Sequence, residues 1–168
     1  GWVPSASELT HVAFGNVLGA DRKMLKSRSG EAVKLDALLN ESVERAAIAV
    51  KEKNAELPAA EQAAVARQIG IGAVKYADLS TDRIKDYVFD WERMLSFEGN
   101  TSPYLQYAHA RICSIFRRAT VDRATVRGIT PTLGHSAERA LALRLLQFDT
   151  AVWDTLEKYS PHRLCTYL

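Results

Sequence analysis

Apolar residues recur at helical spacing along most of the chain, which predicts a mainly α-helical protein. The clearest repeat begins beyond Lys34, with charged side chains on the opposite positions, and predicts a helix over about 36–53. Leu57-Pro58 interrupts the pattern, and a second helix is expected over about 59–77. The apolar stripe of the first helix consists of Leu35, Leu39, Val43, Ala46 and Val50.

The second predicted helix carries a line of small residues, Ala66, Gly70, Ala73 and Ala77, along one face. A glycine inside a helix costs about 1 kcal/mol relative to alanine. Close backbone contact is the usual compensation for that cost. We therefore expect another element of the fold to lie against this line.

Shorter patterns fill the rest of the chain. Residues 9–17 are apolar and β-prone, which predicts a short strand. The apolar group at Phe89, Trp91, Leu95 and Phe97 is assigned to the core, as a rigid base for the loop that follows it. The other expected elements are a short helix over 89–95, a surface loop over 120–134 with room for one helical turn, a helix over 136–159 bent near 149, and a last helix opening at Ser160-Pro161.

A loop over 99–101 runs directly into a helix whose two faces differ in chemistry. Ser102 is the expected N-cap, and Pro103 fits the first helical position. The aromatic and cationic stripe contains Tyr104, Tyr107, Arg111, Ser114 and Arg118, and the packing face contains Leu105, Ala108, Ile112 and Phe116.

Aromatic rings beside guanidinium groups are what a protein needs to hold unpaired bases and phosphates. The stripe on this helix therefore predicts contact with a nucleic acid, and ordinary packing of helix aromatics is the structural alternative. His109 lies between the two faces and is interpreted as packing or hydrogen-bonding. Arg117 and Arg118 contact phosphate or are solvated, and the pattern does not choose between these.

A second cationic segment lies between Gly19 and Gly30, where no apolar period organises the chain and a loop is expected. Its cations and one hydroxyl can gather around phosphate oxygens, or they can form a solvated basic turn. These side chains belong to Arg22, Lys23, Lys26, Ser27 and Arg28.

Composition and charge limit the class of protein and its compartment. The 168 residues carry a formal net charge of +2, which is too mild to indicate nucleic-acid binding by itself. Cys113 and Cys165 lack the spacing of a zinc site or a disulfide scaffold, so we expect buried thiols in a reducing compartment. The sequence has no leader-like segment and no run of eighteen apolar residues, so a soluble, cytoplasmic protein is expected. Both ends read as cuts within a longer polypeptide.

Several blocks of sequence together resemble the arginyl-tRNA synthetases, a class I family. The resemblance spans nearly the whole chain, in order, and its most specific part is the last block. The blocks are His11-Val-Ala-Phe-Gly15, Lys23-Met-Leu-Lys-Ser-Arg-Ser-Gly30, Val74-Lys-Tyr-Ala-Asp-Leu79, Phe89-Asp-Trp91, and Phe97-Glu-Gly-Asn-Thr101 followed by 103–111.

The resemblance implies a helical-bundle anticodon-binding domain over 35–168, truncated at its C-terminus. It is preceded over 1–34 by a short α/β remnant of the Rossmann catalytic domain. Lys23 and Lys26 match the two lysines of the family's KMSKS loop, and Ser27 matches the last serine, whereas Leu25 replaces the middle one. The family uses this loop to stabilise charge on the ATP phosphates, so Lys23 and Lys26 are expected to be catalytic and to bind ATP together with Ser27.

On the RNA side, the resemblance implies that Asn100, Tyr104, Tyr107 and Arg111 contact the anticodon loop of tRNA(Arg). It further implies an arginine–tRNA ligase that uses ATP and Mg²⁺, needs tRNA for activation of L-arginine, does not bind membranes and acts as a monomer. The HIGH-type motif and the arginine pocket are absent from these residues, so the piece alone is expected to be inactive. The alternatives are a non-catalytic helical RNA-binding module and a helical interaction protein.

Overall fold

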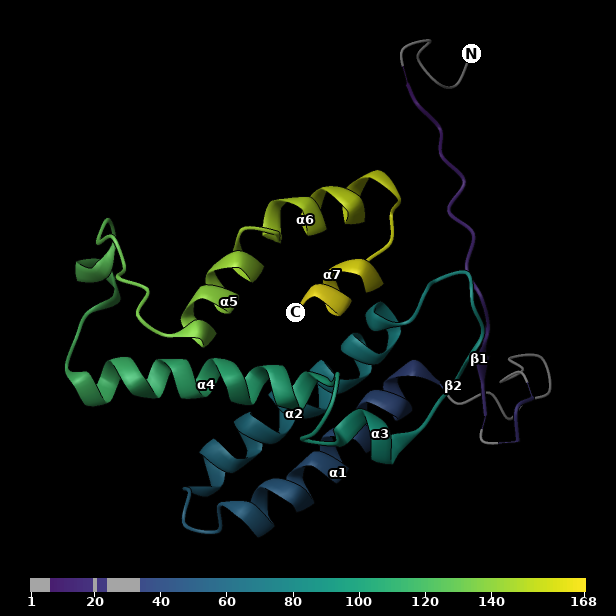
Figure 1. Cartoon of the computed structure of the whole chain (residues 1–168). Coiled ribbons are helices and arrows are strands. Elements are labelled where there is room, and N and C mark those ends of the chain that lie inside the picture. The colour runs from purple at the N-terminus through teal and green to yellow at the C-terminus, as the bar shows by residue number, and fades with distance from the viewer. Residues whose placement is uncertain (1–6, 20, 24–33) are drawn as a thin grey trace.

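The computed structural model describes residues 7–19, 21–23 and 34–168, and it is mainly helical (Figure 1). The predicted ATP-binding residues Lys26 and Ser27 lie outside the described residues. In chain order the elements are β1 (Val17–Leu18), α1 (Leu35–Lys53), α2 (Ala59–Ser80), β2 (Tyr87–Val88), α3 (Trp91–Leu95), α4 (Ser102–Ala119), the 3-10 turn η2 (Arg123–Val126), α5 (Ser136–Leu145), α6 (Phe148–Glu157) and α7 (His162–Tyr167).

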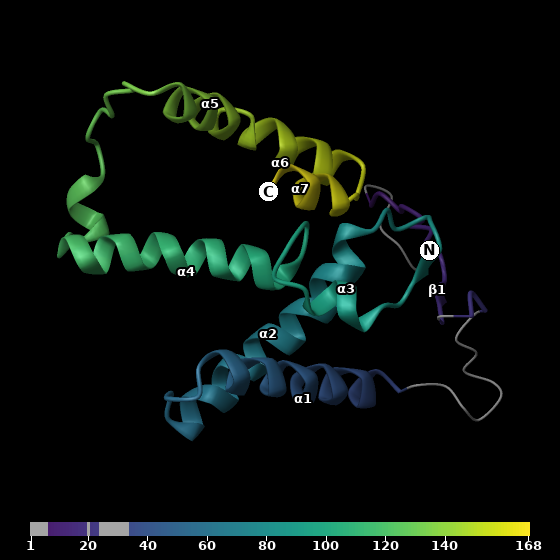
Figure 2. The same cartoon turned by 60° about the horizontal axis from the view of Figure 1, so that its bottom comes forward.

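Helices α1 and α2 pack side by side and form the core of the molecule (Figures 1 and 2). The Ser42 hydroxyl donates a hydrogen bond to the Gly70 carbonyl at 2.7 Å, which requires the two backbones to approach closely. A Cβ at Gly70 would lie 2.7 Å from backbone atoms of Val43. The prediction that an element lies against the small-residue line is therefore confirmed, and that element is α1. The core cluster contains Ala46, Val50 and Ala66, with Val65, Ile69 and Leu95 packed against it.

The predicted strand over 9–17 is wrong in extent, because only Val17 and Leu18 form a strand. They pair in parallel with Tyr87 and Val88. Residues before this point have no strand beside them, and the Phe14 side chain is 86% exposed. Before Val17 the chain makes single hydrogen bonds, such as that from the Gly15 amide to the Arg83 carbonyl, and these do not form the repeated ladder of a strand.

Helix α4 begins where the sequence predicts, but its N-cap is Thr101 and not Ser102. Thr101 has the extended backbone of a cap, and its hydroxyl accepts a hydrogen bond from the Tyr104 amide at 3.3 Å. Ser102 is instead inside the helix, where its hydroxyl accepts from the Gln106 amide group at 3.0 Å. Pro103 is therefore the second residue of the helix and not the first, and it is buried against the rest of the fold.

Only the first half of α4 packs against α2, so the predicted packing face is only partly buried. Leu105 and Ala108 are half-buried, whereas Ile112 on the same face is 54% exposed. In both views the chain leaves α4 at its far end, away from α1 and α2, and returns along α5 and α6 (Figures 1 and 2). The second half of α4 therefore has little to pack against among the described residues.

The C-terminal part contains three short helices. The expected bend near residue 149 is a break at Leu146–Gln147, between α5 and α6. The N-cap of α5 is His135 and not Ser136, and its ring completes a capping box with Glu138. Large apolar side chains on α5 and α6 remain exposed, and these are Leu141, Leu143, Leu145, Phe148, Trp153 and Leu156.

No helix in the described part of the chain is both long enough and apolar enough to cross a membrane.

Candidate nucleic-acid interface

The exposed face of α4 presents the predicted aromatic rings to solvent. The Tyr104 and Tyr107 side chains are 47% and 48% exposed, although both lie in the half of the helix that packs on the core. Arg111, one turn beyond Tyr107, donates from its guanidinium to the Tyr107 hydroxyl at 3.2 Å. Its guanidinium carbon lies 5.7 Å from the centroid of the Tyr107 ring. The structure therefore brings Tyr107 and Arg111 together as a ring with an attached cation.

A groove of about 690 Å³ borders this face on the side of Tyr107. Its walls combine aromatic and amide groups, which suit the flat face and polar edge of an unpaired base. The Lys53 ammonium lies 4.4 Å from the centroid of the Phe97 ring at one end of the groove, and adds a cation there. Sequence reasoning assigned Phe97 to the core, and the structure leaves it half-buried. Side chains that line the groove include Asn54, Gln68, Phe97, Gln106, Tyr107 and His109.

The loop before α4 holds Asn100 close to Tyr76 of α2. The Tyr76 hydroxyl lies 2.5 Å from the Asn100 side-chain oxygen and 3.1 Å from the backbone carbonyl of Cys165 in α7. Gly99 adopts a φ of +80°, a left-handed conformation that glycine adopts without strain, and it turns the chain into this position. Asn100 thereby has its side-chain oxygen engaged inside the protein, while the residue itself stays exposed to solvent.

Burial raises the pKa of Tyr76 from 10.0 to about 12, with Cys165 adding to the shift. The shift extends the pH range over which the hydroxyl remains protonated and can donate. The sequence pattern assigns no binding role to Tyr76, so its contact with the predicted RNA-binding loop is a finding of the structure. The signal available was the Val74–Leu79 block, which belongs to the same family resemblance as Asn100.

Farther along α4, the stripe becomes less distinct. Ser114 is half-buried, whereas Arg117 and Arg118 are both exposed. His109 is exposed, and its ring lies 3.6 Å from the Cys113 sulfur, in agreement with the hydrogen-bonding interpretation. Ile115, which sequence reasoning left out, is 66% exposed one turn after Arg111.

Of the predicted ATP-binding residues, the structure places Lys23. The chain leaves β1 and turns at Gly19, whose amide donates to the Lys23 carbonyl at 2.9 Å. The Lys23 side chain is 84% exposed, and its ammonium lies 3.8 Å from the Asp21 carboxylate. An ion pair this exposed is weak, so the ammonium is free to reach a phosphate group.

The two candidate sites are separate in the structure. In both views β1 lies beyond α3, on the side opposite to the free end of α4 (Figures 1 and 2).

Comparison with known families agrees with this arrangement. Residues 1–91 match the family model described as tRNA synthetases class I (R), catalytic domain. The chain belongs to the class I arginyl-tRNA synthetase family. Residues 105–168 match the DALR anticodon binding domain, so the matched range includes Tyr107 and Arg111. The catalytic-domain match extends through α1 and α2 to Trp91, and the loop with Asn100 lies between the two matched ranges.

Curated relatives carry the same family name. The chain is 54% identical to an arginine–tRNA ligase of Cellvibrio japonicus and 49% identical to one of Erwinia tasmaniensis, over all 168 residues in each case. It spans 29% of the length of each of these relatives. The mainly helical fold, with a short α/β remnant before a helical anticodon-binding domain, is the one that the sequence predicts.

Solved structures show the same fold. The Thermus thermophilus arginyl-tRNA synthetase matches with a TM-score of 0.76 and 38% identity, over 94% of this chain and 25% of that one. The Plasmodium falciparum arginyl-tRNA synthetase matches with a TM-score of 0.78 and 30% identity, over 99% of this chain and 27% of that one. This chain therefore corresponds to about a quarter of a synthetase.

Proposed function

We propose that the intact protein is an arginine–tRNA ligase, which activates L-arginine with ATP and transfers it to tRNA(Arg). Family membership supports this activity, and the match of residues 1–91 to a catalytic-domain model favours it over a non-catalytic RNA-binding module. A role of this chain in tRNA binding is supported chiefly by the exposed face of α4, where the Arg111 guanidinium lies against the Tyr107 ring.

This face contacts the anticodon loop of the tRNA. The Tyr104 and Tyr107 rings stack on unpaired bases, since an exposed ring offers a flat apolar surface to any base. Arg111 supplies a cation for a neighbouring phosphate. Asn100 donates from its side-chain amide to a base edge or to the RNA backbone, while Tyr76 holds the oxygen of the same amide.

The lysine loop contacts ATP at the catalytic end of the chain. When bound, ATP would supply an adenylyl group: as the arginine carboxylate attacks the α-phosphorus, negative charge builds on the phosphate oxygens and pyrophosphate leaves. The exposed Lys23 ammonium fits this task because its weak pairing with Asp21 leaves it free to move toward charge that develops in the transition state. Lys26 and Ser27 take the same role from their place in the KMSKS-like sequence, and Lys23 and Lys26 are the two catalytic lysines.

Mg²⁺ belongs to the intact enzyme in this proposal. In the described part of the chain, no three His, Cys, Asp or Glu side chains gather closely enough to hold a metal ion. We therefore assign no magnesium ligand among the described residues.

The remaining parts of the proposal concern the whole protein. The intact enzyme is a cytoplasmic monomer, and the 168-residue piece by itself does not aminoacylate. The first 34 residues end the catalytic domain, and 35–168 form the truncated anticodon-binding domain. This division stays a prediction, since a range matched by a family model is not a domain limit.

Charging of tRNA(Arg) with labelled L-arginine by the intact protein tests the proposed function. We expect charging that requires ATP and that is lost with a tRNA for another amino acid. Binding of tRNA(Arg) without any charging contradicts the ligase and supports the non-catalytic module. Absence of salt-dependent tRNA binding supports the helical interaction protein instead.

A further inference from the structure

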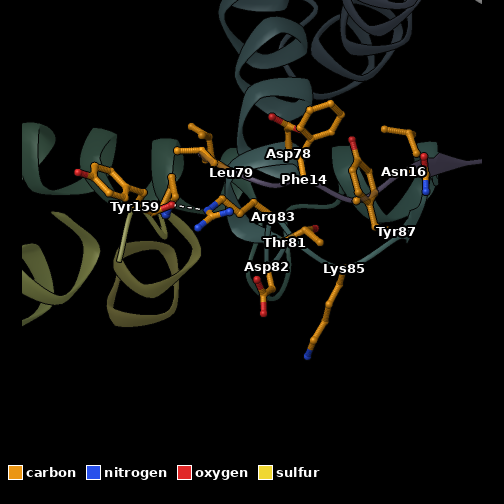
Figure 3. Close-up of a pocket in the computed structure, with 14 residues that line it drawn as sticks. Phe14, Asn16, Asp78, Leu79, Thr81, Asp82, Arg83, Lys85, Tyr87 and Tyr159 are labelled. Atoms are coloured by element: carbon orange, nitrogen blue, oxygen red, sulfur yellow. Dashed lines mark hydrogen bonds between the residues drawn. The ribbon is translucent and has the colours of Figure 1, made fainter. Parts of the chain in front are cut away.

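Arg83, in the connection between α2 and β2, donates to backbone carbonyls from two distant parts of the chain. Figure 3 shows its hydrogen bond to Tyr159. Its Nε donates to the Tyr159 carbonyl at 2.7 Å, and its Nη2 lies 3.3 Å from the Lys158 carbonyl. Its Nη1 donates to the Ala13 carbonyl at 2.5 Å. One guanidinium therefore ties the N-terminal segment to the turn between α6 and α7.

The N-terminal side of this tie is held at further points. The Gly15 amide donates to the Arg83 carbonyl at 2.6 Å, and the Asn16 amide donates to the Asp86 carboxylate at 2.6 Å. A Cβ at Gly15 would overlap the backbone carbonyl of Lys85, so the two segments touch through their main chains. The N-terminal segment is thereby aligned for the pairing of β1 with β2 that begins at Val17.

The same N-terminal segment leads directly into the lysine loop. Val17 and Leu18 form β1, and Lys23 follows after the turn at Gly19. Whatever fixes the segment around Ala13 therefore also fixes the point from which the lysine loop starts.

The other side of the tie belongs to the part of the chain matched by the anticodon-binding model. Lys158 and Tyr159 lie in the turn that ends α6, and Tyr159 adopts a φ of +49°, which points its carbonyl out of the regular helical path. Arg83 lies in the range matched by the catalytic-domain model and Tyr159 lies in the range matched by the anticodon-binding model. A cavity of about 610 Å³ beside Arg83 is lined from both ranges, by Phe14, Asp78, Tyr87 and Tyr159 among others (Figure 3).

Arginine is the side chain suited to this position. Its planar guanidinium presents five donors in a fixed fork, so it reaches three carbonyls in different directions at once. A lysine keeps the positive charge but concentrates its donors at one point, and cannot hold the same three acceptors. Among the described residues its partners are carbonyl oxygens, so its role here is geometric and not the pairing of opposite charges.

We propose that Arg83 is a positioning residue for arginine activation. It holds the strand that leads into the lysine loop in a fixed position relative to the tRNA-binding part of the chain. This inference rests on the proposed function. Misplacement of a catalytic group by about 1 Å lowers the rate by as much as about 100-fold, so loss of the tie lowers turnover even though Arg83 contacts neither ATP nor tRNA.

The test uses the intact ligase with Arg83→Ala and Arg83→Lys, in tRNA-dependent ATP–pyrophosphate exchange normalised to the concentration of active sites. We expect Arg83→Ala to lower kcat by about tenfold or more, with Arg83→Lys close to it. The KM for tRNA(Arg) should change by less than about twofold in both. Arg67→Ala, which removes an exposed arginine from the surface of α2, is the matched control and should leave kcat unchanged.

A second variant distinguishes positioning from general loss of stability. Gly15→Ala forces the N-terminal segment away from the connection between α2 and β2, which Arg83 also joins. The double variant with Arg83→Ala should therefore lower kcat by less than the product of the two single effects. Gly134→Ala, where a Cβ meets nothing closer than 4.0 Å, controls for the substitution itself.

The outcomes separate this inference from the proposed function. An inactive wild-type protein contradicts the proposed function. An active wild type with unchanged kcat in both Arg83 variants overturns the inference alone. Two results assign Arg83 a structural role and also overturn the inference. In one, the effects of Gly15→Ala and Arg83→Ala on kcat multiply in the double variant. In the other, the fall in kcat is matched by the fall in melting temperature. Where Arg83→Ala does not fold, Arg83→Lys decides by the same criteria.

Discussion

The Tyr76 hydroxyl lies 2.5 Å from the side-chain oxygen of Asn100 and joins α2 to the loop that precedes α4. The same hydroxyl lies 3.1 Å from the Cys165 carbonyl, so it also reaches α7. A single phenol therefore fixes three elements around the start of the candidate RNA-binding helix. Asn100 owes its position to this contact as well as to the turn at Gly99.

The raised pKa of Tyr76 predicts a loss of stability at high pH. Burial, with a smaller contribution from Cys165, holds this pKa at about 12 in the folded chain, compared with 10.0 for an unperturbed tyrosine. Between these values the unfolded chain binds fewer protons than the folded chain, so the free energy of unfolding falls as the pH rises from about 10 to 12. This contribution to stability is fully present below pH 10.

Melting temperatures of the intact ligase and of its Tyr76→Phe variant between pH 9 and pH 12 check this prediction. The wild type should lose stability more steeply than the variant across this range. Burial also raises the pKa of Tyr87, which remains in the variant as a common background. Burial raises the pKa of the Cys165 thiol as well, but the Tyr76 hydroxyl lowers it, so the substitution changes this group together with Tyr76. Parallel curves for the two proteins contradict the assignment to Tyr76.

The close approach of α1 and α2 predicts that Gly70 does not tolerate replacement by alanine, whereas Gly72 does. Gly70→Ala places a Cβ 2.7 Å from backbone atoms of Ser42 and Val43, which cannot move without separating the helices. It should lower the free energy of unfolding by about 1–3 kcal/mol. Gly72→Ala meets the flexible end of Gln106 and the Ser102 hydroxyl instead, so the gain of about 1 kcal/mol in helix propensity offsets most of its cost.

Chemical denaturation of the two glycine variants measures this difference directly. Because both substitutions are the same and both lie in α2, the effect on the unfolded chain cancels in the comparison. Equal destabilisation by the two variants is inconsistent with a contact that is specific to Gly70.

The helices could be predicted because their causes are local. The periodic stripe predicted α1 to within one residue of its start, and the small residues of α2 predicted that another element lies against them, which in the structure is α1 with its Ser42–Gly70 hydrogen bond. Caps were predicted less well, since Thr101 and Ser102 are both good capping residues and only the backbone conformation chooses between them.

The remaining features depend on contacts between distant residues. The strand predicted over 9–17 is limited in the structure to Val17–Leu18, because its partner strand is short and lies seventy residues farther along the chain. Tyr76 lies near Asn100, and Arg83 near Tyr159, for the same kind of reason. Sequence reasoning found the exposed ends of the site, such as Tyr107 and Arg111, because those lie one turn apart on one helix.

The aromatic and cationic face of α4 predicts a specific loss of RNA affinity. Tyr104→Ala combined with Arg111→Ala should weaken binding of tRNA(Arg) to the intact ligase by about tenfold or more, since stacking of one base contributes about 1–3 kcal/mol. Filter binding at several salt concentrations measures the loss. Arg67→Ala removes one exposed cation from α2 and not from α4, and should have little effect. If anticodon variants of the tRNA are still discriminated as before, the stripe is structural.

Substitutions in the lysine loop should lower the rate of adenylate formation and leave tRNA affinity unchanged. Lys26→Ala should lower the rate of adenylate formation by about 100-fold, because it removes a cation from charge that develops in the transition state. Lys23→Ala should act in the same direction. Neither should change the dissociation constant of tRNA(Arg), since β1 lies apart from the α4 face. A normal rate of adenylate formation in Lys26→Ala refutes the catalytic role of the loop.

The central claim is that this chain belongs to a ligase in which one part contacts ATP and another contacts tRNA. The most direct test is ATP–pyrophosphate exchange by the intact protein, with and without tRNA(Arg). The account predicts exchange that requires both L-arginine and tRNA(Arg). Exchange that never occurs with arginine, or that depends on a different amino acid, contradicts it.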